Sequence, residues 1–317
     1  MTTTRPPRLT PWDPASTHRF VTSDGTALHV ADSVPDGNAE FTVIFLHGWT
    51  LDHTEWQRVV HNLGGAVNLR LRTIRYDHRG HGGSAPAKPG TATIAQLADD
   101  LAELIADRVP EGPVVLVGHS MGGATIMAFA ERHPELVPRI AGTVFVATTS
   151  GGLSNLTLGL PRWMAPRVVK AEQRVNRRLS TIEHGSLTRH TAVLRPALRW
   201  LVFGKKPHRR DVADTAEQLG RCHPASMAGF RVSLGEHERR DALLALRGKP
   251  TIVLAGGADR LLPVPHSLAH HRRCSARRTG DLPGRGPHAQ RRTRHPGRRP
   301  DRARHRAGPT PKALTPG

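Results

Sequence analysis

The sequence predicts an α/β fold, a mostly parallel doubly wound sheet with an inserted helical cap. Short apolar runs of strand length occur at 41–46, 71–76, 113–117 and 251–255. Between them, residues 93–108 repeat apolar side chains at helical spacing. Strands that alternate with helices favour parallel βαβ units. A chain of 317 residues is long enough for one such domain with an insertion.

Other elements follow from local signals along the chain. Residues 19–22 and 26–30 flank Asp24-Gly25, a pair typical of a two-residue β-hairpin turn. Helices are expected at 53–62 and 124–132, and a further strand at 139–147.

The domain organisation follows from shifts in composition. Residues 1–17 are polar and rich in proline, and we expect them to be disordered. The core is expected to comprise 18–150 and 241–269, interrupted by a helical cap at 151–240 with amphipathic, proline-punctuated segments. Residues 270–317 are interpreted as a basic disordered tail.

The stretch Gly118-His119-Ser120-Met121-Gly122 carries the strongest functional signal. It lies between an apolar strand and a helical run, which is the context of a nucleophile elbow. The tight turn strains the backbone of Ser120, and glycine at 118 and 122 removes the clash that larger residues would cause. The strain directs the Ser120 hydroxyl outward at the carboxyl end of the sheet, so Ser120 is the candidate nucleophile.

Three further motifs follow other strands in order. They are His47-Gly48-Trp49, the stretch Asp77-His-Arg-Gly-His-Gly-Gly-Ser84, and Gly256-Gly257-Ala258-Asp259. Together with the elbow, this set resembles the α/β-hydrolase superfamily, especially its small esterase, lipase and haloperoxidase-like members. The resemblance covers about residues 18–269.

The resemblance implies acyl transfer by a catalytic triad. Asp259 stands where the family carries the acid that orients the catalytic histidine. The backbone N–H groups of Trp49 and Met121 would form the oxyanion hole. Gly48 belongs to the same loop. His47 and His119 are interpreted as residues with local structural roles at tight turns, and the Asp77–Ser84 stretch as a shaped loop.

The catalytic histidine is the departure from the family pattern. The family carries it after the last strand, commonly as Pro-Gly-x-Gly-His. Here the large apolar residues after 270 are Leu282 and Leu314, and no strand or helix with a buried face is expected there. His288, which follows Gly284-Arg-Gly286-Pro287, is the candidate base. If the tail that carries His288 does not pack against the core, Ser120 lacks an activating imidazole and the activity is impaired.

We hypothesise that residues 270–317 are an out-of-frame translation. Back-translation with GC-rich codons, shifted by one base, yields an amphipathic helix end, a short strand and Pro-Gly-Ala-Gly-His. The shifted histidine codon overlaps those of Pro287 and His288. Reading the DNA across codons 265–290 tests this hypothesis.

The net charge of +20 is concentrated in the tail. Residues 270–317 contribute +12, which leaves +8 for residues 1–269. An Arg-rich arm can bind nucleic acid through phosphates. The tail has no aromatic residues for stacking and no recognition motif, so nucleic-acid binding is kept only as an alternative.

Two cysteines, Cys222 and Cys274, give neither a disulfide framework nor a zinc motif. No signal peptide and no membrane span are visible, so a reducing, cytoplasmic setting is expected. No metal and no cofactor are implied. The oligomeric state cannot be read from the sequence.

The predicted function is hydrolysis of a small or lipid-like carboxylic ester through an acyl-Ser120 intermediate. A cofactor-free haloperoxidase-like enzyme of the same fold and a catalytically dead binding protein remain alternatives.

Overall fold

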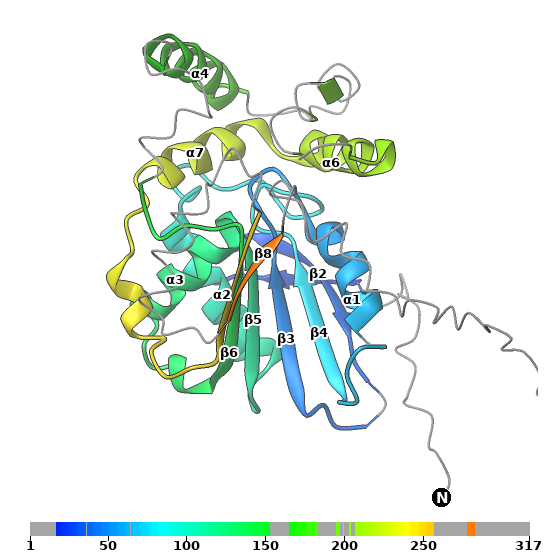
Figure 1. Ribbon diagram of the computed structural model, residues 1–317. Helices are drawn as coiled ribbons and strands as arrows, with labels where there is room; N and C mark the ends of the chain where they lie inside the picture. Colours follow the sequence, from blue (N-terminus) through cyan, green and yellow to red (C-terminus); the bar gives the residue numbers. More distant parts are fainter. Residues whose placement is uncertain are drawn as a thin grey trace, which may run out of the picture.

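The computed structural model of the chain describes residues 17–35, 37–63, 65–152, 165–182, 207–256 and 278–282, together with 195–196, 199 and 203. In these residues one eight-stranded sheet carries helices on both faces (Figure 1). The predicted α/β class, with a mostly parallel sheet, is confirmed.

The strand order in the sheet is β1-β2-β4-β3-β5-β6-β7-β8. The strands are β1 (Thr17–Val21), β2 (Ala27–Ser33), β3 (Phe41–Leu46), β4 (Leu71–Tyr76), β5 (Val114–His119), β6 (Ile140–Val146), β7 (Thr251–Gly256) and β8 (Arg278–Leu282). The pairs β1–β2 and β2–β4 are antiparallel, and the pairs from β4 to β8 are parallel.

The described helices include those expected at 53–62, 93–108 and 124–132, with small shifts at their ends. They are η2 (His53–Trp56), α1 (Gln57–Leu63), α2 (Ile94–Arg108), α3 (Met121–Arg132), η3 (Val137–Arg139), α4 (Ala165–Ser180), α6 (Arg209–Arg221), α7 (Pro224–Gly235) and η6 (Asp241–Leu244). Helix α3 begins three residues before the expected Ala124, because the Ser120 carbonyl already accepts hydrogen bonds from the amides of Gly123 and Ala124. Among the described residues, none of the helices is both long and apolar enough to cross a bilayer.

Two hydrophobic cores lie on opposite faces of the sheet. The larger core joins α2 and α3 to the strands, with fully buried side chains such as Leu101, Phe129 and Ile44. The smaller core packs Trp56 against Phe45, with α1 residues at its edge. Burial of both faces explains why β3 and β5 are mainly apolar, whereas β4 also buries the polar residues Thr73 and Arg75.

The β1–β2 hairpin differs from the expected two-residue turn. Val21 pairs with Ala27, and the Thr22 amide bonds the Thr26 carbonyl, so three residues form the tip. The Asp24 carboxylate accepts from the Thr22 hydroxyl at 2.6 Å and from the Thr26 amide at 3.0 Å. These side-chain bonds stabilise the wider loop, and Gly25 supplies the positive φ of 79°.

The central parallel strands end at one edge of the sheet. Leu46 pairs with both Tyr76 and Gly118, and Gly118 pairs with Phe145. The loops after β3, β4, β5 and β6 therefore start side by side. In open α/β sheets this carboxyl edge is where ligands bind.

Described helices of the 151–240 segment contact those loops. The Arg58 guanidinium of α1 pairs with Asp211 of α6 at 2.7 Å, and Gln218 of α6 donates to the Thr54 hydroxyl of η2 at 2.8 Å. Helices α4, α6 and α7 lie together beyond one end of the sheet (Figure 1). That this segment caps an active site stays a prediction.

Strand β8 differs from the expectation that no strand forms after residue 270. Its backbone pairs in parallel with β7, from Ile252↔Arg278 to Gly256↔Leu282. A parallel ladder uses backbone N–H and C=O groups, which a polar segment also supplies. Apolar periodicity is therefore a poor guide to a strand at the edge of a sheet.

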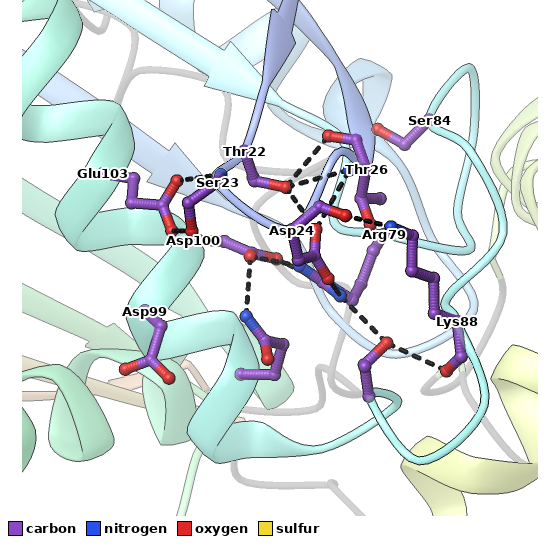
Figure 2. A network of polar contacts seen from close by, with 12 residues as sticks. Thr22, Ser23, Asp24, Thr26, Arg79, Ser84, Lys88, Asp99, Asp100 and Glu103 are labelled. Carbon is purple, nitrogen blue, oxygen red and sulfur yellow. Dashed lines mark hydrogen bonds and ion pairs between the residues drawn. The ribbon is translucent and has the colours of Figure 1, made fainter.

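A buried ion-pair network anchors the loop after β4 (Figure 2). The fully buried Arg79 guanidinium donates to both Asp100 oxygens, at 2.5 and 2.8 Å, and to Asp24 at 2.8 Å. A positive charge removed from water destabilises the fold unless it is paired and hydrogen-bonded, as Arg79 is here. The network ties the 77–84 loop to α2 and to the β1–β2 turn.

Candidate active site

Ser120 occupies the strained position that the elbow motif predicts. It stands between the end of β5 and the start of α3, with φ 48° and ψ −109°. Its amide donates to the Val146 carbonyl at 2.9 Å, and its carbonyl accepts from the Thr148 hydroxyl at 2.8 Å. Main-chain bonds on both sides hold a conformation that costs about 1–3 kcal/mol for a non-glycine residue. The side chain remains partly exposed.

The flanking glycines are required by close backbone approaches. A Cβ atom on Gly118 would lie 2.6 Å from the Gly122 carbonyl carbon and the Gly123 nitrogen. A Cβ atom on Gly122 would overlap the Leu46 carbonyl oxygen and lie 2.7 Å from the Leu46 Cβ. Gly118 therefore permits the tight turn, and Gly122 lets α3 start directly against the end of β3.

The loop after β3 lies against the elbow. A Cβ atom on Gly48 would lie 2.7 Å from His119 Nδ1, which shows how closely the two loops approach. Trp49 follows Gly48, and its indole Nε1 donates to the Met227 carbonyl of α7 at 3.1 Å. Trp49 and Met121, the two expected oxyanion-hole residues, thus belong to segments in mutual contact. Their role as donors stays a prediction.

Glu55 is the residue that sequence analysis missed. Its carboxylate is buried, with Oε1 2.6 Å from His119 Nδ1 and Oε2 accepting from the Gly48 amide at 3.0 Å. Asp52-His-Thr-Glu55 has the spacing of a helix capping box, which predicts a local capping role. Asp52 does accept from the Thr54 amide at 3.0 Å, while Glu55 turns inward. The tertiary contact could not be read from that pattern.

His47 has a structural role in the same loop. Its Nε2 accepts from the His78 amide at 2.9 Å, so the proton resides on Nδ1, which lies 2.8 Å from the Gly48 carbonyl. His47, His78 and His81 are fully buried with rings in contact. Burial lowers the pKa of all three, most plainly of His81, whose pKa falls to about 3. Neutral imidazoles therefore fill this part of the core.

The expected acid and base, Asp259 and His288, lie outside the described residues. Strand β7 ends at Gly256, three positions before Asp259. Their parts in a triad stay predictions.

One group of side chains could hold a metal ion among the described residues. It consists of His29, His53 and Asp77, away from the elbow in the sequence.

Comparison with known proteins decides the family. A profile of the alpha/beta hydrolase fold matches residues 42–286. The chain belongs to this family. The matched region contains the elbow, the loop after β3 and the Asp77–Ser84 loop, so the resemblance drawn from those motifs is confirmed.

Relatives of the hydrolase include enzymes of more than one reaction class. A monoacylglycerol lipase of Mycolicibacterium smegmatis is 26% identical over 258 residues, which cover 80% of this chain and 82% of the lipase. A non-heme chloroperoxidase of Kitasatospora aureofaciens is 40% identical over 91 residues, 29% of this chain, and the match spans only 31% of the chloroperoxidase.

Solved structures share the fold. An esterase from Thermogutta terrifontis superposes with a TM-score of 0.66 at 23% identity, covering 86% of this chain and 92% of the esterase. A bromoperoxidase from Bacillus anthracis gives a TM-score of 0.65 at 17% identity, and the superposition covers 87% of this chain and 94% of the bromoperoxidase. At such identities the similarity establishes architecture alone.

Proposed function

We propose that this hydrolase cleaves carboxylic esters through an acyl-Ser120 intermediate. The observation that carries the proposal is the Ser120 backbone, held at φ 48° at the carboxyl edge of the sheet by hydrogen bonds to Val146 and Thr148. Such a turn presents an alcohol oxygen to solvent rather than to the core.

In the proposed mechanism the Ser120 hydroxyl attacks the ester carbonyl carbon. A histidine accepts its proton, and the amides of Trp49 and Met121 stabilise the negative oxygen of the tetrahedral intermediate. The alcohol leaves with a proton from the same histidine, and water then hydrolyses the acyl-enzyme. We assign Asp259 to orient the histidine and His288 as the candidate base.

The monoacylglycerol lipase relative supports a carboxylic ester as the substrate class. The cap segment would set the acyl and alcohol preferences, as pockets at the carboxyl edge do. The substrate is accordingly proposed only as a small or lipid-like ester.

The proposal is tested with p-nitrophenyl esters and a fluorophosphonate probe. Ser120→Ala should lower kcat by about 10⁴-fold or more, because the nucleophile is lost. Ser180→Ala at the exposed end of α4 is the matched control and should keep the parent rate. Mass spectrometry should locate the phosphonyl adduct on Ser120.

The base is tested by a second comparison. His288→Ala should abolish labelling if His288 acts as the base. If the parent chain is inactive while a version with the frame restored after residue 269 turns over ester, the out-of-frame hypothesis for 270–317 is supported. Absence of turnover and labelling in both versions would contradict the proposed hydrolysis and favour a binding protein.

A haloperoxidase-like activity is the second candidate. The chloroperoxidase match, 40% identical over 91 residues, favours it. Both reactions would use the same nucleophile, with hydrogen peroxide replacing water in attack on the acyl-enzyme. The ratio of peracid formation to ester hydrolysis by one preparation separates the two candidates. Nucleic-acid binding through 270–317 would instead weaken steeply with salt and vanish when these residues are deleted.

A further inference from the structure

Three potential metal ligands converge near the antiparallel side of the sheet. His29 lies on β2, His53 begins η2, and Asp77 directly follows β4. Strand β2 pairs with β4 through Val30↔Tyr76, and the Asp77 amide donates to the His29 carbonyl at 2.9 Å. The loop after β3 brings His53 to the same place, where its amide donates to Asp77 Oδ1 at 2.6 Å. These hydrogen bonds hold the three residues close together.

The side-chain atoms have the spacing of a coordination sphere. One ligand atom from each residue lies within 4.8 Å of the other two, and the two imidazole centroids are 4.9 Å apart. His53 Nδ1 lies 2.8 Å from Asp77 Oδ1. Bonds of about 2.0–2.1 Å to a tetrahedral ion imply ligand separations of roughly 3.4 Å.

The surroundings of the carboxylate suit a ligand role. Asp77 is fully buried, and its Oδ1 lies 2.8 Å from His53 Nδ1. The Gly83 amide donates to Asp77 Oδ2 at 2.8 Å, which orients the carboxylate as an outer-shell partner would.

We propose that His29, His53 and Asp77 bind a divalent transition-metal ion of the zinc class. Two imidazoles and one carboxylate form a donor set that such ions prefer over Mg²⁺ or Ca²⁺. The two histidines are only partly buried, so water can complete the coordination. The ion replaces the proton shared by His53 Nδ1 and Asp77 Oδ1, and that proton passes to His53 Nε2 or to solvent.

Sequence analysis expected no metal. The three ligands lie far apart in the chain and form no spacing motif that would have pointed to them. The pairing of β2 with β4 creates the site.

The test uses the full chain, stripped of metal, with Co²⁺ and Zn²⁺ as probes. Because the chain holds 20 histidines, adventitious binding must be separated from the site. His29→Gln is the main variant, since its partly exposed ring can be replaced without disturbing the backbone bonds. His53→Gln is the second. His18→Gln and His61→Gln, at exposed positions, are the matched controls.

We expect the parent and both controls to bind one Co²⁺ with visible absorption bands and to show a higher Tm with Zn²⁺. His29→Gln and His53→Gln should bind about 100-fold more weakly and lose the Zn²⁺-dependent rise in Tm. Circular dichroism without metal verifies that each variant is folded. Equal affinity in parent and variants, or no saturable binding by the parent, would overturn the proposal.

Discussion

The Glu55 carboxylate links the loop after β3 to the end of β5, directly before Ser120. Its Oε1 lies 2.6 Å from His119 Nδ1, and its Oε2 accepts the Gly48 amide at 3.0 Å. One buried carboxylate thus fixes both the residue before the proposed nucleophile and the residue before the proposed donor Trp49. Because acyl transfer depends on the distance between nucleophile and oxyanion donors, Glu55 is a candidate positioning residue.

Replacing Glu55 by Gln should reduce both stability and turnover. An amide offers only one acceptor oxygen, so either Gly48 N–H or His119 faces an unsuitable group in a buried place. We expect a loss of about 2–4 kcal/mol in the free energy of unfolding and a roughly 10- to 100-fold lower kcat. Glu135→Gln, at an exposed position, is the control. Urea denaturation and ester kinetics measure the two effects, and a Glu55→Gln variant equal to the control would refute the positioning role.

Gly122→Ala should damage the elbow, whereas Gly235→Ala should not. A methyl group at 122 would overlap the Leu46 carbonyl oxygen, which is backbone and cannot move aside. At Gly235 the nearest atom is the flexible end of Arg231, 3.6 Å away. We expect Gly122→Ala to lower the unfolding free energy by about 2 kcal/mol or more, and Gly235→Ala to leave it nearly unchanged. Thermal denaturation of the pair decides the prediction, which fails if both variants melt together.

Asp100 and Asp99 are neighbours on α2 with very different environments. Asp100 pairs with Arg79 where both side chains are almost fully buried, while Asp99 pairs with Arg132 near the surface. Asp100→Asn leaves the buried Arg79 guanidinium without its main negative partner and should lower the free energy of unfolding by about 3–5 kcal/mol. Asp99→Asn should cost about 0–1 kcal/mol. Chemical denaturation of both variants gives the comparison, and similar losses would contradict the burial argument.

The buried histidines predict loss of stability in mild acid. His81 has a folded pKa of about 3 and an ordinary value of 6.5, so between these values the unfolded chain binds a proton that the folded chain excludes. Stability therefore falls as pH drops below 6.5, by up to about 1.4 kcal/mol per pH unit for this residue. Burial and the nearby Arg239 likewise lower the pKa of His237 to about 4.

This pH dependence is measured as the slope of unfolding free energy between pH 5 and 6.5. His81→Gln should reduce the mean slope over this interval by about 1 kcal/mol per pH unit, because the unfolded imidazole is only partly protonated near pH 6.5, and His237→Gln provides a second case. The exposed His61→Gln should keep the parent slope. Slopes that are the same in all variants would show that these imidazoles do not set the acid sensitivity.

The sequence predicted those features that depend on local patterns. Short strand-like segments predicted the central strands, and the Gly118–Gly122 motif predicted a strained backbone at Ser120, which the structure has with φ 48°. The turn at Asp24-Gly25 was expected to have two residues and has three, because hydrogen bonds to the Asp24 carboxylate stabilise the longer loop. Strand β8 was not expected, since edge pairing needs no apolar periodicity.

By itself, the sequence determined the fold class, the elbow and the identity of the proposed nucleophile, because backbone strain and hydrophobic periodicity are properties of neighbouring residues. Tertiary structure alone decided that Glu55 meets His119 and that His29 meets His53 and Asp77. These contacts arise where separate strands end at a shared edge or pair side by side. No spacing within the chain encodes them, because strand order in the sheet, rather than order in the sequence, sets the distances between their side chains.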